Sequence, residues 1–574
     1  MKIETIRHSL AHLLAMAVRE LYPTVKFGIG PNIENGFYYD FGLKESLAPQ
    51  DLPKIEKRMR ELIKQNIQFK KRKVTRAQAQ KLFKNQPYKL KLIKDLKNIT
   101  VYESSTFTDL CSGPHIKSTK EIPLNGFKLT KLAGAYWQGN EKNPMLQRVY
   151  GIAFETREQL EDFIQREKEA EKRDHRVLGK KLDLFVFSDL VGKGLPLFTE
   201  KGSIIRRELE RFVIDEEIKQ GYKHVYTPEL AKVELYKKSG HYPYYKDSMY
   251  PVMKVDEEEL ILRPMTCPHH FQLYASRPRS YKELPMRIAE LAKQFRYEKS
   301  GELTGLIRLR SFCLADAHII CQPEQAKQEL NNVIDLIEHM ASALGLNSSI
   351  NYRYRLSLGD RKNSKKYYKD DKSWNTAENT LRDVLKERKS PFFEAKNEAA
   401  FYGPKIDFQM KNFAGKEDTA FTIQYDFVMP KRFNLTYIDK DGKEKEPIVI
   451  HRSAIGAIER TIAFLLEHYA GALPFWLSPV QVFVIPIGEK HQKYAQTIAQ
   501  QLKDKKLRIE VKDGNETISK KIREAELQKI PYSLVIGDQE LKAKSISVRE
   551  RQKGNLGSMK LEQFIEKVEK QTKN

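Results

Sequence analysis

The sequence has 574 residues, enough for three or four domains, and its 40% apolar and 31% charged residues fit a soluble globular protein. The formal net charge of +25 favours a polyanionic partner, nucleic acid before membrane, although a Lys-rich proteome would give the same excess. No apolar run reaches the roughly 20 residues of a membrane span, and two histidines interrupt the N-terminal segment where a signal peptide would be apolar, so we expect a cytoplasmic protein.

The cysteines are too few and too widely spaced for the disulfide framework of a secreted protein. They indicate a reducing compartment and a use in metal binding or catalysis. They are Cys111, Cys267, Cys313 and Cys321.

The first predicted element is a helix over residues 4–20, in which His8 and His12 share one face because they are four residues apart. Such a pair is common in metal and acid–base sites, but two polar surface histidines would look the same. Residues 28–41 then predict a hairpin with Asn35-Gly36 as its turn.

Residues 50–97 are strongly basic and predicted to be helical, either as a solvated face or as a surface that contacts an RNA backbone. Residues 130–154 end this unit with a Gly-aromatic turn and a strand. Residues 155–182 predict a charged linker helix to the next domain.

A predicted loop holds Cys111 and His115, which are again four residues apart, with Asp109 just before them. Together with His8 and His12 they make a candidate four-ligand cluster from distant parts of the chain. It is interpreted either as a zinc site or as a metal-free hydrolytic site, in which histidine and cysteine position water and Asp109 orients them.

From residue 202 the pattern predicts an amphipathic helix to 219 and then a strand over 221–230 that ends at Pro228, a unit that often forms a dimer interface. Residues 261–275 run from strand to turn to helix. Cys267 lies at that turn, where a thiolate can be presented to a cleft.

A long-loop hairpin is predicted over 286–321, with strands that end at Phe295 and resume from Leu306 to Ile320. Arg296 and Glu298 end the first strand on one face. The returning strand carries Arg308, Arg310, Asp316 and His318. The arginines, carboxylate and histidine on one surface could hold a polyphosphate next to a metal. The alternative interpretation is a charged hairpin that only contacts solvent.

Residues 401–408 predict a Gly-Pro turn that leads into a strand, and 422–427 predict the strand after it. A strand ended by His451 then leads into a helix that carries Arg460. Cys267, His318 and His451 make a Cys/His/His set, and three protein ligands leave a metal one open position for substrate. Spacing alone does not select these three residues among thirteen histidines. Residues 479–574 alternate strands and helices, which predicts a small α/β domain.

Several of these segments resemble the class II aminoacyl-tRNA synthetases. FRYE…IRLRSF resembles their motif 2, GAIER at 456–460 their motif 3, and the helix and strand ending at Pro228 their motif 1. Within the class, the sequence resembles the threonyl-tRNA synthetases over essentially its whole length. The segments that carry this resemblance, in order, are RHSLAHLL, GFYYDF, DLCSGPH, LAGAYWQG, MLQRVYG, MTCPHH, ADAHIIC, FYGPKIDF, IHRSAIGAIER and PVQV.

The resemblance implies an α+β multidomain protein built around a class II antiparallel-sheet core. The implied parts are an α/β editing domain at 1–154, a linker helix at 155–182, a catalytic domain at 183–475 and an α/β anticodon-binding domain at 479–574. The implied reaction joins L-threonine to tRNA(Thr) through threonyl-adenylate. Hydrolysis of mischarged seryl-tRNA(Thr) is expected beside it, because a pocket that accepts threonine discriminates against serine only roughly 10–200-fold.

The resemblance also implies a role for each matching residue. Cys267, His318 and His451 would hold one catalytic Zn²⁺ per subunit, which binds the amino group and hydroxyl of threonine and rejects valine for want of that hydroxyl. In the catalytic domain, Asp316 would hold the threonine hydroxyl and Tyr402 its amino group. Arg296 would bind the α-phosphate of ATP, Arg460 the γ-phosphate and Glu298 the adenine. Gln424 would lie on the strand under the nucleotide and threonine. Mg²⁺ would accompany ATP.

In the implied editing domain His8, His12, Asp109, Cys111 and His115 occupy the site, which in this family works through side chains and water. Asn515, Glu540 and Arg549 match anticodon contacts, and Lys529 stands where an arginine is usual, which weakens bidentate contacts. Homodimerisation through the motif 1 element is expected.

Two departures from the family pattern stand out. Leu314-Ala315 precedes Asp316 where Gln-Asp is usual, so Arg296 is left to hold the substrate carboxylate, or binding is weaker. The resemblance also leads us to expect a chain that begins at the editing domain and lacks the small ubiquitin-like domain of many relatives. Two alternative functions remain: an inactive paralogue that serves as a regulator or RNA-binding protein, favoured only by Leu314-Ala315, and a stand-alone deacylase, which the retained core residues oppose.

Overall fold

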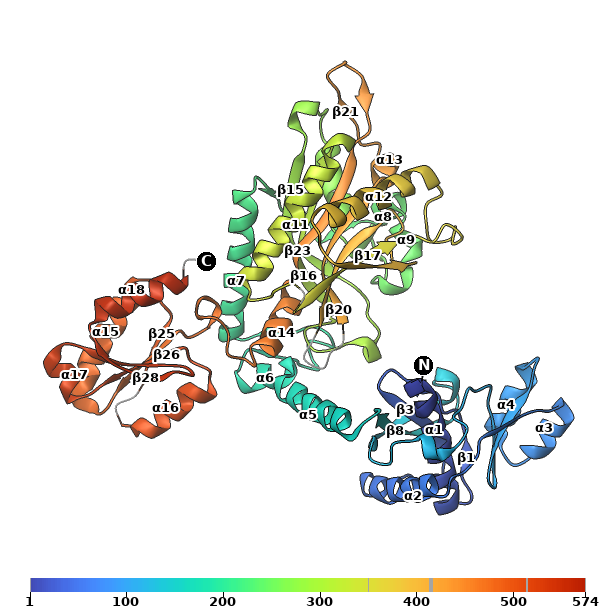
Figure 1. The fold of residues 1–574 in the computed structure, drawn as a ribbon. Coiled ribbons are helices and arrows are strands. Elements are labelled where there is room, and N and C mark those ends of the chain that lie inside the picture. The colour runs from blue at the N-terminus through green and yellow to red at the C-terminus, as the bar shows by residue number, and fades with distance from the viewer. Residues whose placement is uncertain (1, 349, 412–416, 513–514, 573–574) are drawn as a thin grey trace. The chain divides into compact units, whose positions relative to one another are not determined.

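The computed structural model describes residues 2–348, 350–411, 417–512 and 515–572. By its contacts the chain divides into two compact units, Met1–Lys168 and Glu169–Asn574 (Figure 1). Both units combine helices with mainly antiparallel sheets, so the α+β class is confirmed. Within the described ranges, no helix is both long and apolar enough to cross a lipid bilayer.

The first unit is built on α1 (Lys2–Leu21), whose Leu10, Leu14 and Val18 are fully buried at helical spacing. This confirms the predicted N-terminal helix. An antiparallel sheet lies beside α1, with the order β1-β3-β8-β7 and β2 paired to β3. Its strands are β1 (Lys26–Phe27), β2 (Asn32–Ile33), β3 (Gly36–Gly42), β7 (Phe127–Tyr136) and β8 (Met145–Ala153).

The hairpin turn of this sheet falls one residue earlier than predicted. Ile33 pairs with Gly36, so Glu34 and Asn35 make the turn and Gly36 already belongs to β3. A Cβ on Gly36 would lie 2.0 Å from the carbonyl oxygen of Gly151. The glycine is therefore required by the close approach of β8 rather than by the turn.

A second, smaller sheet of β4, β5 and β6 completes this unit. Its strand β4 (Lys70–Lys73) shows that the prediction of helices throughout 50–97 is wrong in part. Its four side chains are all exposed, so the segment lacks the apolar alternation that identifies a strand. The remaining elements are α2 (Leu52–Lys64), α3 (Arg76–Leu82), α4 (Pro87–Asp95), β5 (Thr100–Ser104) and β6 (Phe107–Leu110).

Two helices, not one, occupy the predicted linker at 155–182. They are α5 (Arg157–Arg173) and α6 (His175–Lys181). The chain breaks at Asp174, whose side chain accepts the backbone N–H of Arg176 at 2.7 Å and so caps α6.

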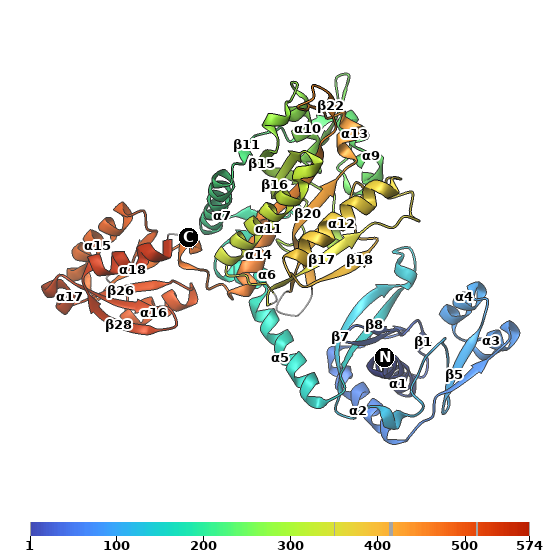
Figure 2. The ribbon, with the colours of Figure 1, turned by 45° about the horizontal axis from the view of Figure 1, so that its top comes forward.

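An eight-stranded sheet forms the centre of the second unit, in the order β11-β15-β16-β23-β20-β19-β17-β18 (Figures 1 and 2). All neighbours are antiparallel except β11 with β15 and β17 with β18. The strands are β11 (Lys223–His224), β15 (Met286–Phe295), β16 (Ser311–Cys321), β17 (Tyr352–Leu358), β18 (Phe392–Lys396), β19 (Lys405–Lys411), β20 (Glu417–Asp426) and β23 (Ile448–Ala457).

Helices cover this sheet and build its core. The helix α11 packs on β23 and β20, α14 on β16 and β23, and α12 on β17 (Figures 1 and 2). The longer helices of this unit are α7 (Glu200–Lys219), α10 (Cys267–Ala275), α11 (Ala326–Ala343), α12 (Asp371–Glu387) and α14 (Ile458–His468). The shorter elements are β9 (Phe185–Val186), β10 (Leu197–Phe198), β12 (Leu230–Lys232), α8 (Val233–Ser239), α9 (His241–Tyr244), β13 (Met253–Val255), β14 (Glu258–Leu262), α13 (Met429–Phe433), β21 (Tyr437–Ile438) and β22 (Glu444–Lys445).

Three predicted strands differ from those of the structure. The returning strand of the hairpin starts at Ser311 rather than Leu306, because Thr304 and Arg308 close a tight turn first. The strand predicted over 221–230 is reduced to the two residues of β11. His451 lies inside β23 and does not end it.

The C-terminal part confirms the predicted α/β alternation. Its sheet has the order β25-β24-β26-β27-β28, parallel in the first three strands and antiparallel beyond them. The elements are β24 (Val482–Pro486), α15 (Gln492–Asp504), β25 (Ile509–Val511), α16 (Ile518–Leu527), β26 (Tyr532–Ile536), α17 (Asp538–Ala543), β27 (Ile546–Glu550), β28 (Gly554–Met559) and α18 (Leu561–Thr572).

Candidate functional site

The Cys/His/His set comes together on the central sheet. Ligand atoms of Cys267, His318 and His451 all lie within 4.8 Å of one another, and all three residues are buried. Cys267 opens α10, while His318 and His451 face each other directly across β16 and β23. Strand register therefore brings together residues that are far apart in the sequence.

Hydrogen bonds fix which nitrogen each histidine offers. Nδ1 of His318 lies 2.8 Å from Nδ1 of His270, and Nε2 of His451 lies 2.7 Å from the Asp426 carboxylate. Nε2 of His318 and Nδ1 of His451 are left to face the cluster. Burial lowers the pKa of His318 well below its usual value, so its imidazole is neutral, as a metal ligand must be.

A chain of polar residues extends behind His318. Nε2 of His270 lies 3.2 Å from Glu290, which also pairs with the buried guanidinium of Arg263 at 3.0 Å. Burial would raise the pKa of Glu290, but hydrogen bonds from His270 and Thr227 and the charge of Arg263 lower it to about 2. Sequence reasoning missed this chain, although His270 follows Cys267 by only three residues.

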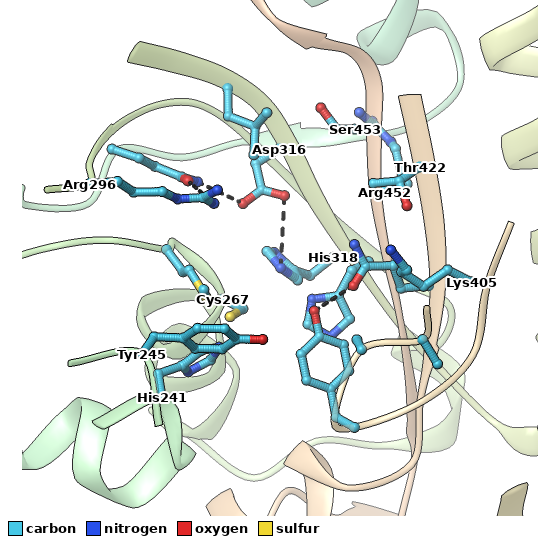
Figure 3. A pocket seen from close by; sticks show the side chains of 18 of the residues that line it. His241, Tyr245, Cys267, Arg296, Asp316, His318, Lys405, Thr422, Arg452 and Ser453 are labelled. Carbon is cyan, nitrogen blue, oxygen red and sulfur yellow. Dashed lines mark hydrogen bonds and ion pairs between the residues drawn. The ribbon is translucent and has the colours of Figure 1, made fainter. Parts of the chain in front are cut away.

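A cavity of about 410 Å³ opens beside the cluster (Figure 3). Arg296, Asp316, Tyr402 and Gln424 line it, and Figure 3 shows Asp316 and His318 facing the same space. The Tyr402 hydroxyl donates to Oε1 of Gln424 at 2.5 Å. Apolar Leu314 also lines this cavity.

A second cavity, of about 730 Å³, adjoins the first, since Arg296, Leu314 and Gln424 line both. Arg460 and Glu298 line the second cavity but not the first. Arg460 is held by the carbonyls of Ile307 and Thr419, each at 3.1 Å, and Arg308 pairs with Glu298 at 2.8 Å. Several guanidinium groups that line one cavity suit a polyphosphate.

His241 is a cavity residue that sequence reasoning missed. Its Nδ1 lies 2.7 Å from the Ser239 hydroxyl, while Nε2 is buried without a hydrogen-bond partner among the described residues. Burial lowers the pKa of His241 to about 3. The cavity therefore contains a neutral imidazole whose Nε2 can accept a hydrogen bond. No sequence motif marked this histidine.

A second cluster lies in the first unit. Cys111 Sγ lies 3.3 Å from Nε2 of His8 and from Nε2 of His115, and His12 lies 3.6 Å from Asp109. The structure thus brings together all five residues predicted here. Candidate ligand atoms of the three histidines and the cysteine lie within 4.8 Å of one another.

Two further residues complete this cluster and were missed. Lys89 and Tyr39, both buried, contact the Asp109 carboxylate at 2.5 and 2.6 Å. Burial raises the pKa of the Cys111 thiol to about 11, and burial lowers the pKa of His8. At neutral pH the cluster therefore presents a neutral thiol and a neutral imidazole beside a lysine–aspartate pair.

The three predicted anticodon residues lie on different elements of the C-terminal part. Asn515 precedes α16, Glu540 lies in α17 and Arg549 in β27. Glu540 accepts the backbone N–H of Gly537 at 2.9 Å and so caps its own helix. Arg549 lines a cavity of about 400 Å³ with Lys529, whereas Asn515 and Glu540 do not.

Family models match three stretches of the chain. The "tRNA synthetase class II core domain (G, H, P, S and T)" matches residues 250–469, and the "Anticodon binding domain" matches 481–571. The "Threonyl and Alanyl tRNA synthetase second additional domain" matches 99–150, which includes Asp109, Cys111 and His115.

Whole-chain comparisons agree with these matches. A threonine–tRNA ligase of Geobacillus sp. (strain WCH70) is 48% identical over 569 residues, 98% of this chain and 88% of the relative. One of Staphylococcus carnosus (strain TM300) is 47% identical over 568 residues, 98% of this chain and 87% of the relative. The solved RNA-binding domain of threonyl-tRNA synthetase from Cryptosporidium parvum Iowa II has a TM-score of 0.65 at 35% identity, over 69% of this chain and 98% of that chain.

Proposed function

Since the chain belongs to the threonyl-tRNA synthetase family, we propose that it joins L-threonine to tRNA(Thr) with ATP and hydrolyses mischarged seryl-tRNA(Thr). The observation that carries the proposal is the pair of adjoining cavities, which share Arg296 and Gln424. The first cavity has the Cys/His/His cluster in its wall and the second has the arginines. An amino acid and a nucleotide bound in them would meet at Arg296.

Zinc is proposed at Cys267, His318 and His451, one ion per subunit. The residues fit it, because a buried thiol and two buried imidazoles converge and a cation would offset the burial that raises the pKa of Cys267. When bound, zinc would supply a Lewis acid with an open position for the amino group and hydroxyl of threonine. Valine lacks that hydroxyl and would leave polar partners in the site unsatisfied.

The side chains around the cluster orient the amino acid. Asp316 is proposed to accept the hydrogen bond of the threonine hydroxyl, and Tyr402 to contact the amino group. Gln424 holds the Tyr402 hydroxyl in place and lies at the junction of the two cavities. The threonine carboxylate would then point toward Arg296.

Adenylate formation follows from that placement. An oxygen of the threonine carboxylate would attack the α-phosphorus, the bond from the α-phosphorus to the oxygen that bridges to the β-phosphate would break, and pyrophosphate would leave. Mg²⁺ bound with ATP would supply positive charge to the phosphates. Arg296 would stabilise charge on the α-phosphate and Arg460 on the γ-phosphate. Glu298 would accept hydrogen bonds from the adenine once Arg308, its partner here, turns to the phosphates.

Editing is proposed at the cluster of His8, His12, Asp109, Cys111 and His115, with 1–154 as the editing domain. A neutral thiol beside a neutral imidazole supports the positioning of a water molecule rather than nucleophilic attack by sulfur. That water would attack the seryl ester, whose bond to the tRNA ribose breaks. We propose that this site works without a metal.

The remaining chain is proposed to bind tRNA and a second subunit. Residues 155–182 would be the linker, 183–475 the catalytic domain and 479–574 the anticodon-binding domain, with contacts from Asn515, Glu540 and Arg549. Exposed apolar side chains support a homodimer, since Tyr226 of the motif 1 element is 92% exposed and Leu190, which precedes that element in the sequence, is 100% exposed. A cytoplasmic location is proposed with this function.

Amino-acid-dependent ATP–pyrophosphate exchange tests the synthetase activity. Exchange is expected with threonine, to a lesser extent with serine, and not with valine. Absence of exchange with all three, in folded protein that holds zinc, would overturn the proposal. Serine exchange equal to that with threonine would remove the discrimination assigned to this cavity.

A further inference from the structure

Gln294 lies at the floor of the amino-acid cavity with its side chain 1% exposed. Its Nε2 donates to the Thr266 hydroxyl at 3.0 Å and, over a longer distance of 3.5 Å, to the Asp316 carboxylate. Its Oε1 accepts a hydrogen bond from Nη2 of Arg296 at 3.4 Å. One amide thus contacts both residues that are proposed to hold opposite ends of threonine.

Strand register explains this position. Gln294 is opposite Phe312 and Glu290 is opposite Asp316, so alternate residues of β15 and β16 share the cavity face. Gln294 and Leu314 are diagonal neighbours on that face. Leu314 cannot hydrogen-bond, and Gln294 is therefore the nearest neutral polar side chain on these two strands to Asp316.

The chemistry of the amide suits both neighbours at once. A carboxylate at this place would repel Asp316, and an ammonium group would repel Arg296. A carboxamide donates to the first and accepts from the second. Because Gln294 is buried on a strand, its two contacts constrain the directions of both charged groups.

We propose that Gln294 is a positioning residue for the amino acid, which orients Asp316 toward the substrate hydroxyl and Arg296 toward its carboxylate. This rests on the proposed function. It assigns Gln294 to binding of threonine rather than to binding of ATP or zinc.

Gln294→Met tests the proposal, because methionine keeps the length and the apolar stem but loses the amide. The KM for threonine in pyrophosphate exchange is expected to rise about tenfold or more, which is the loss expected for hydrogen bonds to charged groups. The KM for ATP should rise less than the KM for threonine, because only the contact with Arg296 bears on the α-phosphate. The zinc content and the folding of the protein should stay close to wild type. Direct calorimetric titration with threonine should show the same weakening.

Gln481→Met is the matched control. Gln481 is also buried, at 2% exposed, and bonds to the carbonyl of Phe475 at 3.0 Å in the C-terminal part. The Gln481→Met variant should have a lower melting temperature but the same KM for threonine. Adding Leu314→Gln to Gln294→Met places an amide on the diagonal position of the same face, and it should restore part of the lost affinity.

An unchanged KM for threonine in Gln294→Met would overturn the proposal, as would equal rises in KM for threonine and ATP. If Gln294→Met does not fold, Gln294→Glu gives the answer, since its carboxylate faces Asp316 and should weaken threonine binding more than ATP binding. Absence of threonine-dependent exchange in the wild type would instead overturn the proposed function, so the two failures are distinguishable.

Discussion

Nδ1 of His318 lies 2.8 Å from Nδ1 of His270, so a hydrogen bond joins a histidine of the cluster to a histidine outside it. His270 is held in turn by Glu290 on its other nitrogen. This fixes the ring of His318 with Nε2 toward Cys267 and His451. The arrangement resembles the outer partners that orient metal-binding histidines in general.

The first prediction concerns His270. His270→Ala should lower zinc affinity about 10–100-fold, because the ring and tautomer of His318 are no longer fixed. Competition with a chromophoric chelator measures this directly. His269→Ala is the control, since this neighbouring histidine is also buried and is not one of the three candidate ligands. Equal zinc affinity in the two variants would contradict the prediction.

The second prediction concerns Cys267. Cys267→Ala should abolish zinc content and threonine activation together, because it removes one of three ligands. Metal analysis and pyrophosphate exchange on the same preparation check it. Cys313→Ala provides a matched buried cysteine outside the cluster and should retain zinc. Full activity in metal-free Cys267→Ala protein would refute the zinc assignment.

The third prediction separates the two sites. His8→Ala should leave threonine charging intact and let seryl-tRNA(Thr) accumulate, because His8 contacts Cys111 in the first unit and not the catalytic cavities. Deacylation of pre-formed seryl-tRNA measures the loss, and threonyl-tRNA formation is the internal control. A deacylation rate equal to that of wild type would remove His8 from the editing site.

The fourth prediction concerns the pH dependence of Cys111. Burial raises the pKa of this thiol to about 11, so the reactive thiolate is scarce at neutral pH and increases as pH rises. Alkylation by iodoacetamide, followed on the Cys111 peptide by mass spectrometry, should therefore accelerate about tenfold per pH unit from pH 7 to 10.

A metal in this cluster would give a different profile, because a coordinated cysteine is already deprotonated. Alkylation would then vary little with pH and would respond to a chelator. Such a result would favour zinc over the metal-free site. The other three cysteines are buried and serve as slow internal references.

Local patterns predicted most elements of the fold. Apolar residues that repeat every 3.6 positions located the helices α1 and α7, and the apolar/polar pattern located the strand β15. These patterns arise because each element buries apolar side chains in the protein core. The exposed strand Lys70–Lys73 has no apolar face and was missed for that reason. The start of β16 was misplaced because a turn, not the alternation, decides where pairing begins.

The candidate site was predictable only in part. Family resemblance selected Cys267, His318 and His451, whereas spacing could not, since their proximity depends on the pairing of β16 with β23. His270 and Gln294 were within reach of the sequence, one beside the cysteine and one two residues before Arg296 on the same strand face. Lys89 and His241 had no local signal, because tertiary packing alone brings them to their sites.

The alternation of β16 also determines where the chain tolerates changes in length. Leu314, Asp316 and His318 face the cavity while Ala315 and Ala317 are buried on the other face. A single inserted or deleted residue in this strand would exchange the two sets and place alanines where the carboxylate and imidazole belong. The exposed turn between β21 and β22 has no such constraint. Natural and engineered indels should therefore accumulate in that turn and be absent from β16.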